Sequence, residues 1–420
     1  MKTRKPVLAG DPKFDPRHGS EKRLEAYLGE IGSLLGDKRR RESFAMYACG
    51  LFGEGDRKSA EPVAARLCGD PDRVEKTHQK LLHFLARSEW KDQPVRVLAA
   101  RYALKLMQTR GAITHWIFDD TGFLGQGKHS PGVKRQYTGS AGKVANCQVA
   151  VSLTLANGQT QLPIDFSLFL PEDWAADPDR CRAAKIPATM VHRPKWQIAL
   201  DMIDVALADE MPRGVVLADA DYGNKTDFRD GLDERGLQYA VAVQLTTSVR
   251  RVHNSGARRR VGKRMSVEEL AFSLPESAIR KTTWREGTSA PMAARFAVVR
   301  VEPMPGKEAP RAEQWLVIEW GLGSHRPDGY TLATLPKDIS RKQLIASLKE
   351  RWRTERAYQD LKGELGLDHF EGRSFTGWHH HVTVVLACYA FMVAEQMRGF
   401  PPSCHHADDS PAAGALDHAA

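Results

Sequence analysis

Two apolar segments of this chain end abruptly in acidic residues, and this feature most constrains the fold. Ile-Thr-His-Trp-Ile-Phe (113–118) runs into Asp119-Asp120, and Gly-Val-Val-Leu-Ala (214–218) runs into Asp219. Short apolar runs bounded by polar residues are typical of buried strands. Ligands bind in α/β proteins at the ends of such strands, so we expect the two carboxylates to meet at one edge of a sheet.

The segments around these two strands predict a mixed α/β sheet. Further predicted strands lie at 144–155, 161–170 and 239–243, and the turn Asn157-Gly158 joins the first two. Helical periodicity covers 196–208 and 224–235, between the later strands. Strands followed by alternating helices and strands indicate an α/β sheet flanked by helices and exclude a repeat protein.

By composition and sequence pattern, the whole chain divides into five parts. We expect a helical N-terminal domain at 1–110, the first part of the catalytic core at 111–244, a β-rich insertion at 245–338, core helices at 339–398 and a disordered tail at 399–420. Within the insertion, short strands are predicted at 282–284, 294–301, 315–320 and 330–335. After it, one helix is predicted at 340–365 and a buried apolar helix at 382–397.

The charge of the chain favours a polyanionic partner. The net charge is +9 and the pI about 9.2, and residues 1–110 hold 23 Lys and Arg against 15 Asp and Glu. A solvated basic surface explains such an excess equally well. The six cysteines show no paired spacing for zinc or disulfides, the N-terminus lacks a secretory signal, and the apolar run 382–394 is too short to span a bilayer. We therefore expect a cytoplasmic protein with no membrane partner.

A late charged segment supplies a third acid. In Arg-Trp-Arg-Thr-Glu-Arg-Ala-Tyr-Gln-Asp-Leu-Lys (351–362), helical spacing places Arg351, Glu355 and Lys362 on one face. Together with Asp119 and Asp219, Glu355 makes a set of carboxylates that suits two Mg²⁺ or Mn²⁺ ions. Each acid taken alone is more simply a helix cap or a surface charge, so the shared context carries the prediction.

The two strand-end motifs resemble those of a known family, the DDE-type transposases of bacterial insertion sequences. Phe-Asp-Asp-Thr-Gly (118–122) resembles the family's first-acid motif, with Asp119 as the acid. Leu-Ala-Asp-Ala-Asp-Tyr-Gly (217–223) resembles the second, with an aromatic-glycine pair after Asp219. The resemblance covers residues 20–398.

The late segment resembles the same family's third signature. Arg351, Glu355 and Lys362 reproduce its spacing of Arg, three residues, Glu, six residues and Lys, and the flanking segments 366–369 and 378–381 also look like this family's sequence. One position departs from the signature, since Leu348 stands where the family has a tyrosine. The resemblance implies a ribonuclease H-like core, Asp119, Asp219 and Glu355 as catalytic metal ligands, and Arg351 and Lys362 as contacts to the cleaved strand.

The resemblance also implies a function. We expect a transposase that binds the terminal inverted repeats of its element, cleaves the ends and joins the 3′-hydroxyls to target DNA, as a synaptic homodimer close to the nucleoid. A metal-dependent nuclease without strand transfer is the alternative enzyme. A repeat-binding repressor that has lost its chemistry is the alternative from another class.

Two basic segments are candidates for contacts to DNA phosphates. Gly-Phe-Leu-Gly-Gln-Gly-Lys (122–128) nearly matches a nucleotide-binding loop, but His129 stands where Ser or Thr must reach magnesium, and Pro131 precludes the helix. We expect no nucleotide cofactor and instead a basic loop whose contacts are Lys128, Lys134 and Arg135. Residues 250–264 hold seven Lys or Arg and no acid. They are either a solvated loop or a phosphate clamp built from Arg258, Arg259 and Arg260.

Three consecutive histidines, 379–381, follow Trp378. Neighbouring helical residues point in different directions, so one shared metal ion is not expected. Packing against the helix of Glu355, or contact with DNA, is the preferred interpretation.

Overall fold

The central sheet is built around the long strand β3 (Lys143–Ala156). One edge of β3 pairs with β1 (His115–Leu124), and the other edge pairs with β2 (Lys134–Thr138) and β4 (Gln161–Leu168), all antiparallel. β1 pairs in parallel with β5 (Val215–Ala218), and β5 in parallel with β6 (Tyr239–Val243). The computed structural model describes residues 19–68, 70–139, 141–255, 258–285, 291–304 and 310–399. The order β4-β3-β1-β5-β6 confirms the predicted ribonuclease H-like mixed sheet.

The sequence explains this hairpin and these strands locally. β3 is buried from Cys147 to Ala156, as expected of a central strand covered on both faces. The turn to β4 uses Asn157, whose side-chain oxygen accepts hydrogen bonds from the backbone N–H groups of Gln159 and Thr160. Gly158 adopts a φ of 79°, a conformation that glycine reaches without strain.

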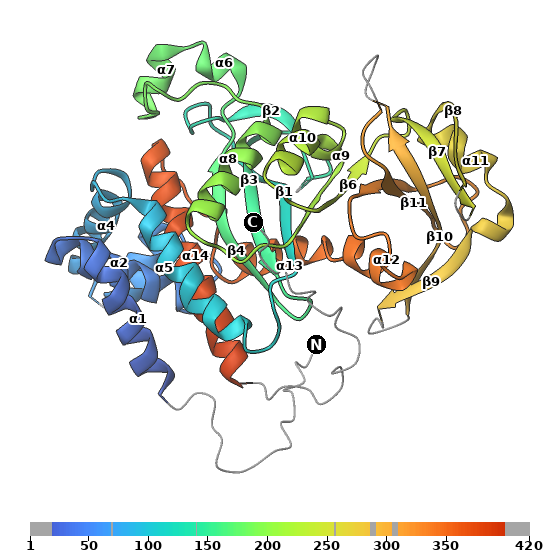
Figure 1. The fold of residues 1–420 in the computed structure, drawn as a ribbon. Coiled ribbons are helices and arrows are strands. Elements are labelled where there is room, and N and C mark those ends of the chain that lie inside the picture. The colour runs from blue at the N-terminus through green and yellow to red at the C-terminus, as the bar shows by residue number, and fades with distance from the viewer. Residues whose placement is uncertain are drawn as a thin grey trace.

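Helices cover both faces of the sheet. α13 (Trp352–Gly363) contacts β1 and β4 on one face, while α8 (Lys195–Ala208) contacts β3 on the other. α9 (Ala220–Gly223) follows β5 directly, lies against β6, and is followed by α10 (Thr226–Glu234). The loop before α8 contains α6 (Glu172–Ala175) and α7 (Pro178–Ala183). Figure 1 shows α8, α9 and α10 together over the sheet.

The β-rich insertion continues the same sheet. β12 (Gly329–Ala333) pairs with β6, and the order then runs β12-β11-β10-β7-β8, with β9 on β10. The elements of the insertion are β7 (Ser248–Ser255), β8 (Arg258–Ser266), α11 (Val267–Ser273), η1 (Glu276–Ala278), β9 (Arg280–Arg285), β10 (Met292–Pro303) and β11 (Gln314–Trp320). Of the two alternatives left open for 250–264, the loop is contradicted, because β7 and β8 form a hairpin there, and the phosphate clamp stays a prediction. Val249 and Val252 are buried in that hairpin. The many charged residues around them masked the strand pattern in the sequence.

The predicted helix 340–365 is two helices. α12 (Arg341–Lys349) ends at Glu350, and α13 begins after Arg351. Leu344 and Ile345 of α12 are buried in an apolar cluster that includes strands of the insertion. Ala357 and Leu361 of α13 are buried outside that cluster. One straight helix cannot bury both apolar faces, so the chain turns between them. α14 (Phe375–Gly399) is longer than predicted at its N-terminal end.

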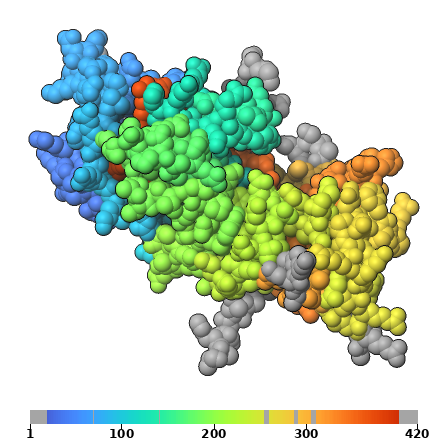
Figure 2. Space-filling model, turned by 90° about the horizontal axis from the view of Figure 1, so that it is seen from above, coloured from blue at the N-terminus to red at the C-terminus, as the bar shows by residue number. Residues whose placement is uncertain are grey.

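The N-terminal helices pack on α14 and the edge of the sheet. They are α1 (Ser20–Leu34), α2 (Lys38–Phe52), α3 (Ala60–Leu67), α4 (Pro71–Ala86) and α5 (Asp92–Met107). Their apolar side chains belong to one cluster with β3, β4 and α14. In Figures 1 and 2 this helical part and the insertion lie at opposite ends of the molecule. The division into domains stays a prediction, and the expected tail at 399–420 lies, except for residue 399, outside the described residues.

Helices long and apolar enough to cross a bilayer are not found among the described residues.

Gly223 tests the contact that holds α9 on the sheet. A Cβ there would lie 2.1 Å from the carbonyl oxygen of Ala242 and 2.8 Å from Cβ of Val241. We expect Gly223→Ala to lower the free energy of unfolding by roughly 1–3 kcal/mol, because backbone must move to make room. Gly125→Ala is the control, since nothing lies within 4 Å of its added Cβ. Equal denaturation midpoints for the two variants would contradict this packing.

Candidate active site

Asp119 lies in the middle of β1, which continues to Leu124, so the predicted strand end at Asp119 was wrong; Asp219 does follow directly after β5. β1 and β5 pair in parallel from His115–Val215 to Ile117–Leu217, and two further residues along the same register bring Asp119 level with Asp219. Asp219 is the N-cap of α9, where its carboxylate accepts a 2.9 Å hydrogen bond from the N–H of Asp221. The predicted meeting of two carboxylates at one sheet edge is therefore present in the structure.

Asp119 is mostly buried and lies close to other charged groups. Its side chain is 13% exposed. The pKa of this carboxyl is raised to about 7, mainly by burial. The charges of Asp219 and Asp120 also raise the pKa, whereas Arg351 and the N–H of Asp120 lower it. Burial and the charge of Asp221 also raise the pKa of Asp219. Two adjacent carboxyls that resist ionisation form an environment that a cation would stabilise.

Arg351 connects Asp119 to the third acid. Its guanidinium lies 3.1 Å from Asp119 Oδ2 and 3.4 Å from Glu355 Oε1. This i,i+4 pair confirms that Arg351 and Glu355 share a face of α13. Glu355 is 59% exposed, so it lies at the solvent side of the site while Asp119 lies inside. α13 is held on the sheet by a 2.7 Å hydrogen bond between Thr354 and Thr154.

The donor set fits a divalent cation without forming a closed cage. Within the described ranges, no three His, Cys, Asp or Glu side chains are close enough together to enclose an ion. The guanidinium of Arg351 instead bridges two of the predicted ligands. The donors are carboxylate oxygens, the type that Mg²⁺ and Mn²⁺ prefer. The raised pKa of Asp119 and of Asp219 comes mainly from burial and to a lesser extent from neighbouring carboxylates.

Lys362 faces the same strand from farther along α13. Its Nζ donates a 2.9 Å hydrogen bond to the carbonyl oxygen of Gly122 and lies 5.5 Å from the centre of the Phe123 ring. Burial lowers the pKa of this amine. In this structure Lys362 braces α13 against β1. Its expected contact with a DNA strand stays a prediction.

The other basic candidates lie on two separate hairpins. Lys128, Lys134 and Arg135 are exposed around β2, and Lys134 lies 2.9 Å from Asp173. On the β7–β8 hairpin, Arg259 pairs with the buried Glu302, while Arg260 is exposed. The side chain of Arg258 lies outside the described residues. These two groups of cations therefore do not form one cluster with the acids.

Sequence reasoning assigned no role to four residues at the site, which are Asp120, Lys195, Tyr222 and Tyr358. Asp120 accepts hydrogen bonds from Lys195 Nζ and from the hydroxyl of Tyr222, and both partners are on the face opposite to Asp119. Tyr358 of α13 lies on the Asp119 side, 2.5 Å from Ser152 Oγ. The doubled acid at 119–120 was the available signal, because neighbouring strand residues point to opposite faces.

Two other sequence features are structural here. Leu348 packs with the apolar cluster that contains Leu344 and Ile345. His380 stacks on Trp90, and His381 lies 2.9 Å from the hydroxyl of Tyr47, so the histidines pack α14 against the N-terminal helices. These two histidines do pack in the interior, but against the N-terminal helices and not against the helix of Glu355 as expected.

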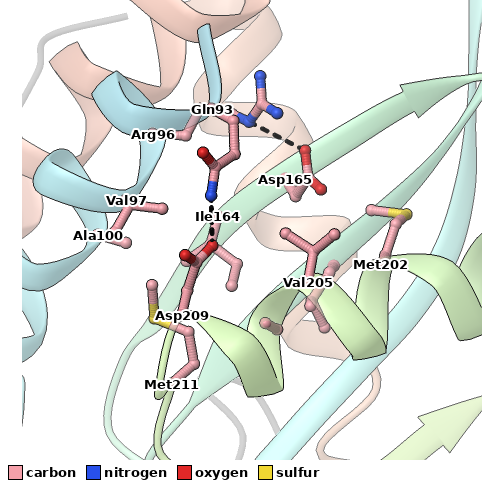
Figure 3. A pocket seen from close by; sticks show the side chains of 12 residues that line it. Gln93, Arg96, Val97, Ala100, Ile164, Asp165, Met202, Val205, Asp209 and Met211 are labelled. Carbon is pink, nitrogen blue, oxygen red and sulfur yellow. Dashed lines mark hydrogen bonds and ion pairs between the residues drawn. The ribbon is translucent and has the colours of Figure 1, made fainter. Parts of the chain in front are cut away.

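A cavity away from the acids is too small for a nucleotide. It lies between α5, β4 and α8, and its volume is about 20 Å³. Figure 3 shows its polar contacts, in which Arg96 pairs with Asp165 at 3.0 Å and Gln93 donates to Asp209 at 2.7 Å. Such a space holds about one water molecule.

Comparison with known proteins supports the sequence resemblance. Residues 30–291 match the family model described as DDE superfamily endonuclease, and residues 195–391 match that described as transposase DDE domain. The chain is 29% identical over 230 residues to the probable transposase for insertion sequence element IS701 of Microchaete diplosiphon. That match covers 54% of this chain and 56% of the relative, so the chain spans about half the length of the curated relative it matches.

The raised pKa of Asp119 predicts a pH-dependent stability. The unfolded carboxyl has its usual pKa of 3.8, whereas burial raises the pKa of the folded one to about 7. The folded state therefore binds more protons between these values, and the contribution of Asp119 to stability falls as pH rises from 4 to 7. The melting temperatures of Asp119→Asn and of the parent protein are compared in chelator. We expect the difference between them to shift by roughly 2–4 °C in favour of the variant when the pH is raised from 4.5 to 8.

A variant of opposite sign controls for general pH effects. Burial raises the pKa of Glu302, but hydrogen bonds from Arg250 and Arg259 outweigh it and hold the pKa below its usual value. The contribution of Glu302 is therefore present at neutral pH and is lost on acidification. Glu302→Gln should lower the melting temperature most at pH 8. Parallel trends for the two variants would count against the assignment for Asp119.

Proposed function

This chain belongs to the DDE superfamily of endonucleases, and we propose that it is an insertion-sequence transposase. It would bind the terminal inverted repeats of its element, cut the DNA at the ends and join the freed 3′-hydroxyls to target DNA. The observation that supports this most directly is the Arg351 guanidinium between Asp119 and Glu355, next to Asp219. This guanidinium joins two of the three family acids, and the third, Asp219, follows the neighbouring strand β5.

The proposed reaction has two steps on phosphodiesters. Water attacks the phosphorus at the element end, the bond to the 3′-oxygen breaks, and that oxygen leaves as a 3′-hydroxyl. This hydroxyl then attacks a target phosphodiester, a new P–O bond forms, and the target's 3′-oxygen leaves. Two Mg²⁺ or Mn²⁺ ions, held by Asp119, Asp219 and Glu355, would activate the attacking oxygen and stabilise the leaving one.

The protein's own residues orient the acids and the strand. In the structure, Arg351 neutralises part of the charge on Asp119 and Glu355. When DNA binds, its guanidinium is the cation nearest to the acids that can turn to a phosphate, for which its planar donors are suited. Lys362 keeps α13 seated on β1 through Gly122.

A basic surface beside the acids would carry the DNA. No acidic residue occurs from Thr121 to Ile164, and the exposed Lys128 and Arg135 lie in this stretch, after β1 ends at Leu124. DNA backbone contacts come mainly from such cations. Repeat recognition by residues 1–110, a synaptic homodimer and a cytoplasmic site of action near the nucleoid are further parts of the proposal.

A joining assay tests the chemistry. Purified protein is incubated with Mg²⁺, DNA carrying the element ends and a target plasmid. We expect cut ends and joined products, and Glu355→Gln should reduce both by at least about 100-fold while repeat binding changes little. Glu364→Gln, which removes an exposed carboxylate just after α13, is the matched control and should retain activity.

The same assay separates the competing functions. Cut ends without joined product would favour the metal-dependent nuclease. Repeat binding without any cleavage, unaffected by Glu355→Gln, would favour a repressor that has lost its chemistry.

The salt dependence of DNA affinity tests the basic residues one by one. Each lost phosphate contact should reduce the slope of log affinity against log salt by roughly 0.9. We expect this reduction for Lys128→Ala, Arg135→Ala and Arg260→Ala. Arg259→Ala should leave the slope unchanged, because the charge of that side chain is already paired with Glu302. Unchanged slopes for all four variants would place the DNA elsewhere.

A further inference from the structure

We propose that Asp120 is a positioning residue, which holds Asp219 at a fixed offset from Asp119 through Tyr222 and Lys195. The inference rests on the proposed function, because it concerns how the same acids are aligned. Its basis is the pair of hydrogen bonds that Asp120 accepts, one from the Tyr222 hydroxyl and one from Lys195 Nζ.

The backbone pairing alone does not extend to the acids. The ladder between β1 and β5 runs from His115–Val215 to Ile117–Leu217, and β5 ends at Ala218. Asp119 and Asp219 lie beyond the last of these pairs. A contact from the β1 side chains to α9 must therefore set the distance between the two carboxylates.

Tyr222 makes that contact. It lies one helical turn after Asp219, in the short helix whose N-cap is Asp219 itself. Its ring is fully buried and packs against Phe228, with the ring centres 5.7 Å apart. The next residue, Gly223, lies directly on β6. Because Tyr222 is fixed in this way, its hydrogen bond to Asp120 ties β1 to α9.

Lys195 supplies the charge that this arrangement needs. Asp120 is 18% exposed and lies next to two other carboxylates, so an unpaired charge there would push the acids apart. Lys195, at the start of α8, pairs with Asp120 and also interacts electrostatically with Asp221 and Asp219. Thus Lys195 and Arg351 offset negative charge from opposite faces of β1.

Asp120 itself does not face the third acid. Asp119 pairs across the sheet with Ser152, which bonds to Tyr358 of α13, whereas Asp120 points to α8 and α9. A carboxylate on that face would affect metal binding only by positioning the acids next to it. Partners of this kind typically change metal affinity by 10- to 100-fold when they are removed.

Metal binding without DNA tests the inference. Mn²⁺ affinity is measured by calorimetry for the parent protein and for Asp120→Asn, alongside the Mg²⁺ concentration that gives half-maximal cleavage. We expect Asp120→Asn to weaken Mn²⁺ binding about 10-fold and to raise the Mg²⁺ requirement similarly, with the cleavage rate at saturating Mg²⁺ recovered to within about threefold. Tyr222→Phe should act in the same direction, by about threefold.

A double variant tests whether the two residues act through one bond. If they do, Asp120→Asn combined with Tyr222→Phe should bind Mn²⁺ as weakly as Asp120→Asn alone. Additive losses would overturn the proposed link. Should Asp120→Asn fail to fold, Tyr222→Phe still decides, since an unchanged Mn²⁺ affinity in that variant would also overturn it.

Asp165→Asn is the matched structural control. Asp165 is likewise buried and paired with a cation, Arg96, but it lies on β4 beside the small cavity (Figure 3). We expect this variant to lower the melting temperature and to leave Mn²⁺ affinity within twofold. If Asp120→Asn behaves in the same way, its role is purely structural and the inference fails.

Two outcomes separate this inference from the proposed function. Loss of Mn²⁺ binding in Asp120→Asn as complete as in Asp119→Asn, with no recovery at high metal, would make Asp120 a ligand and overturn the positioning role while the function stands. Absence of Mn²⁺ binding in the parent protein would overturn both the inference and the proposed metal site.

Discussion

The parallel pairing of β1 with β5 is the constraint on which the site depends. It places Asp119 level with Asp219 although the chain forms a hairpin, a long loop and a helix between them. β3 pairs with β1 along the whole length of β1, so the position of Asp119 is set by its pairing with Ser152 of β3. Asp219 is less constrained, because it follows the last residue of β5 and begins α9.

The charge at this edge explains much of the surrounding structure. Buried carboxylates next to one another are costly unless cations or a metal compensate them. Arg351 does so on the α13 face, and Lys195 does so on the α8 face. Burial keeps the pKa of Asp119 above its usual value even with Arg351 nearby, so the compensation of its charge is only partial. A divalent cation would complete it, and the proposed reaction needs such an ion at the same place.

The break between α12 and α13 links the insertion to the third acid. Lys349 at the end of α12 lies 2.5 Å from Glu319 of β11, so α12 is fixed to the insertion. α13 is fixed to the core through Thr354 and through the hydrogen bond of Arg353 to the carbonyl of Gly158. Glu355 therefore occupies a position that depends on both parts, in the first turn after the break.

The sequence by itself determined the sheet, the β-rich insertion and the candidate acids, because apolar runs, turn residues and charge spacing are local patterns. The grouping of Asp119, Asp219 and Glu355 was predicted from sequence motifs that resemble those of a known family. Tertiary structure decided that Arg351 lies between two of them, that Asp120 faces away toward Lys195 and Tyr222, and that residues 250–264 form a hairpin. These are pairings between distant segments, and no local pattern specifies which cation will lie against a buried carboxylate once the chain has folded.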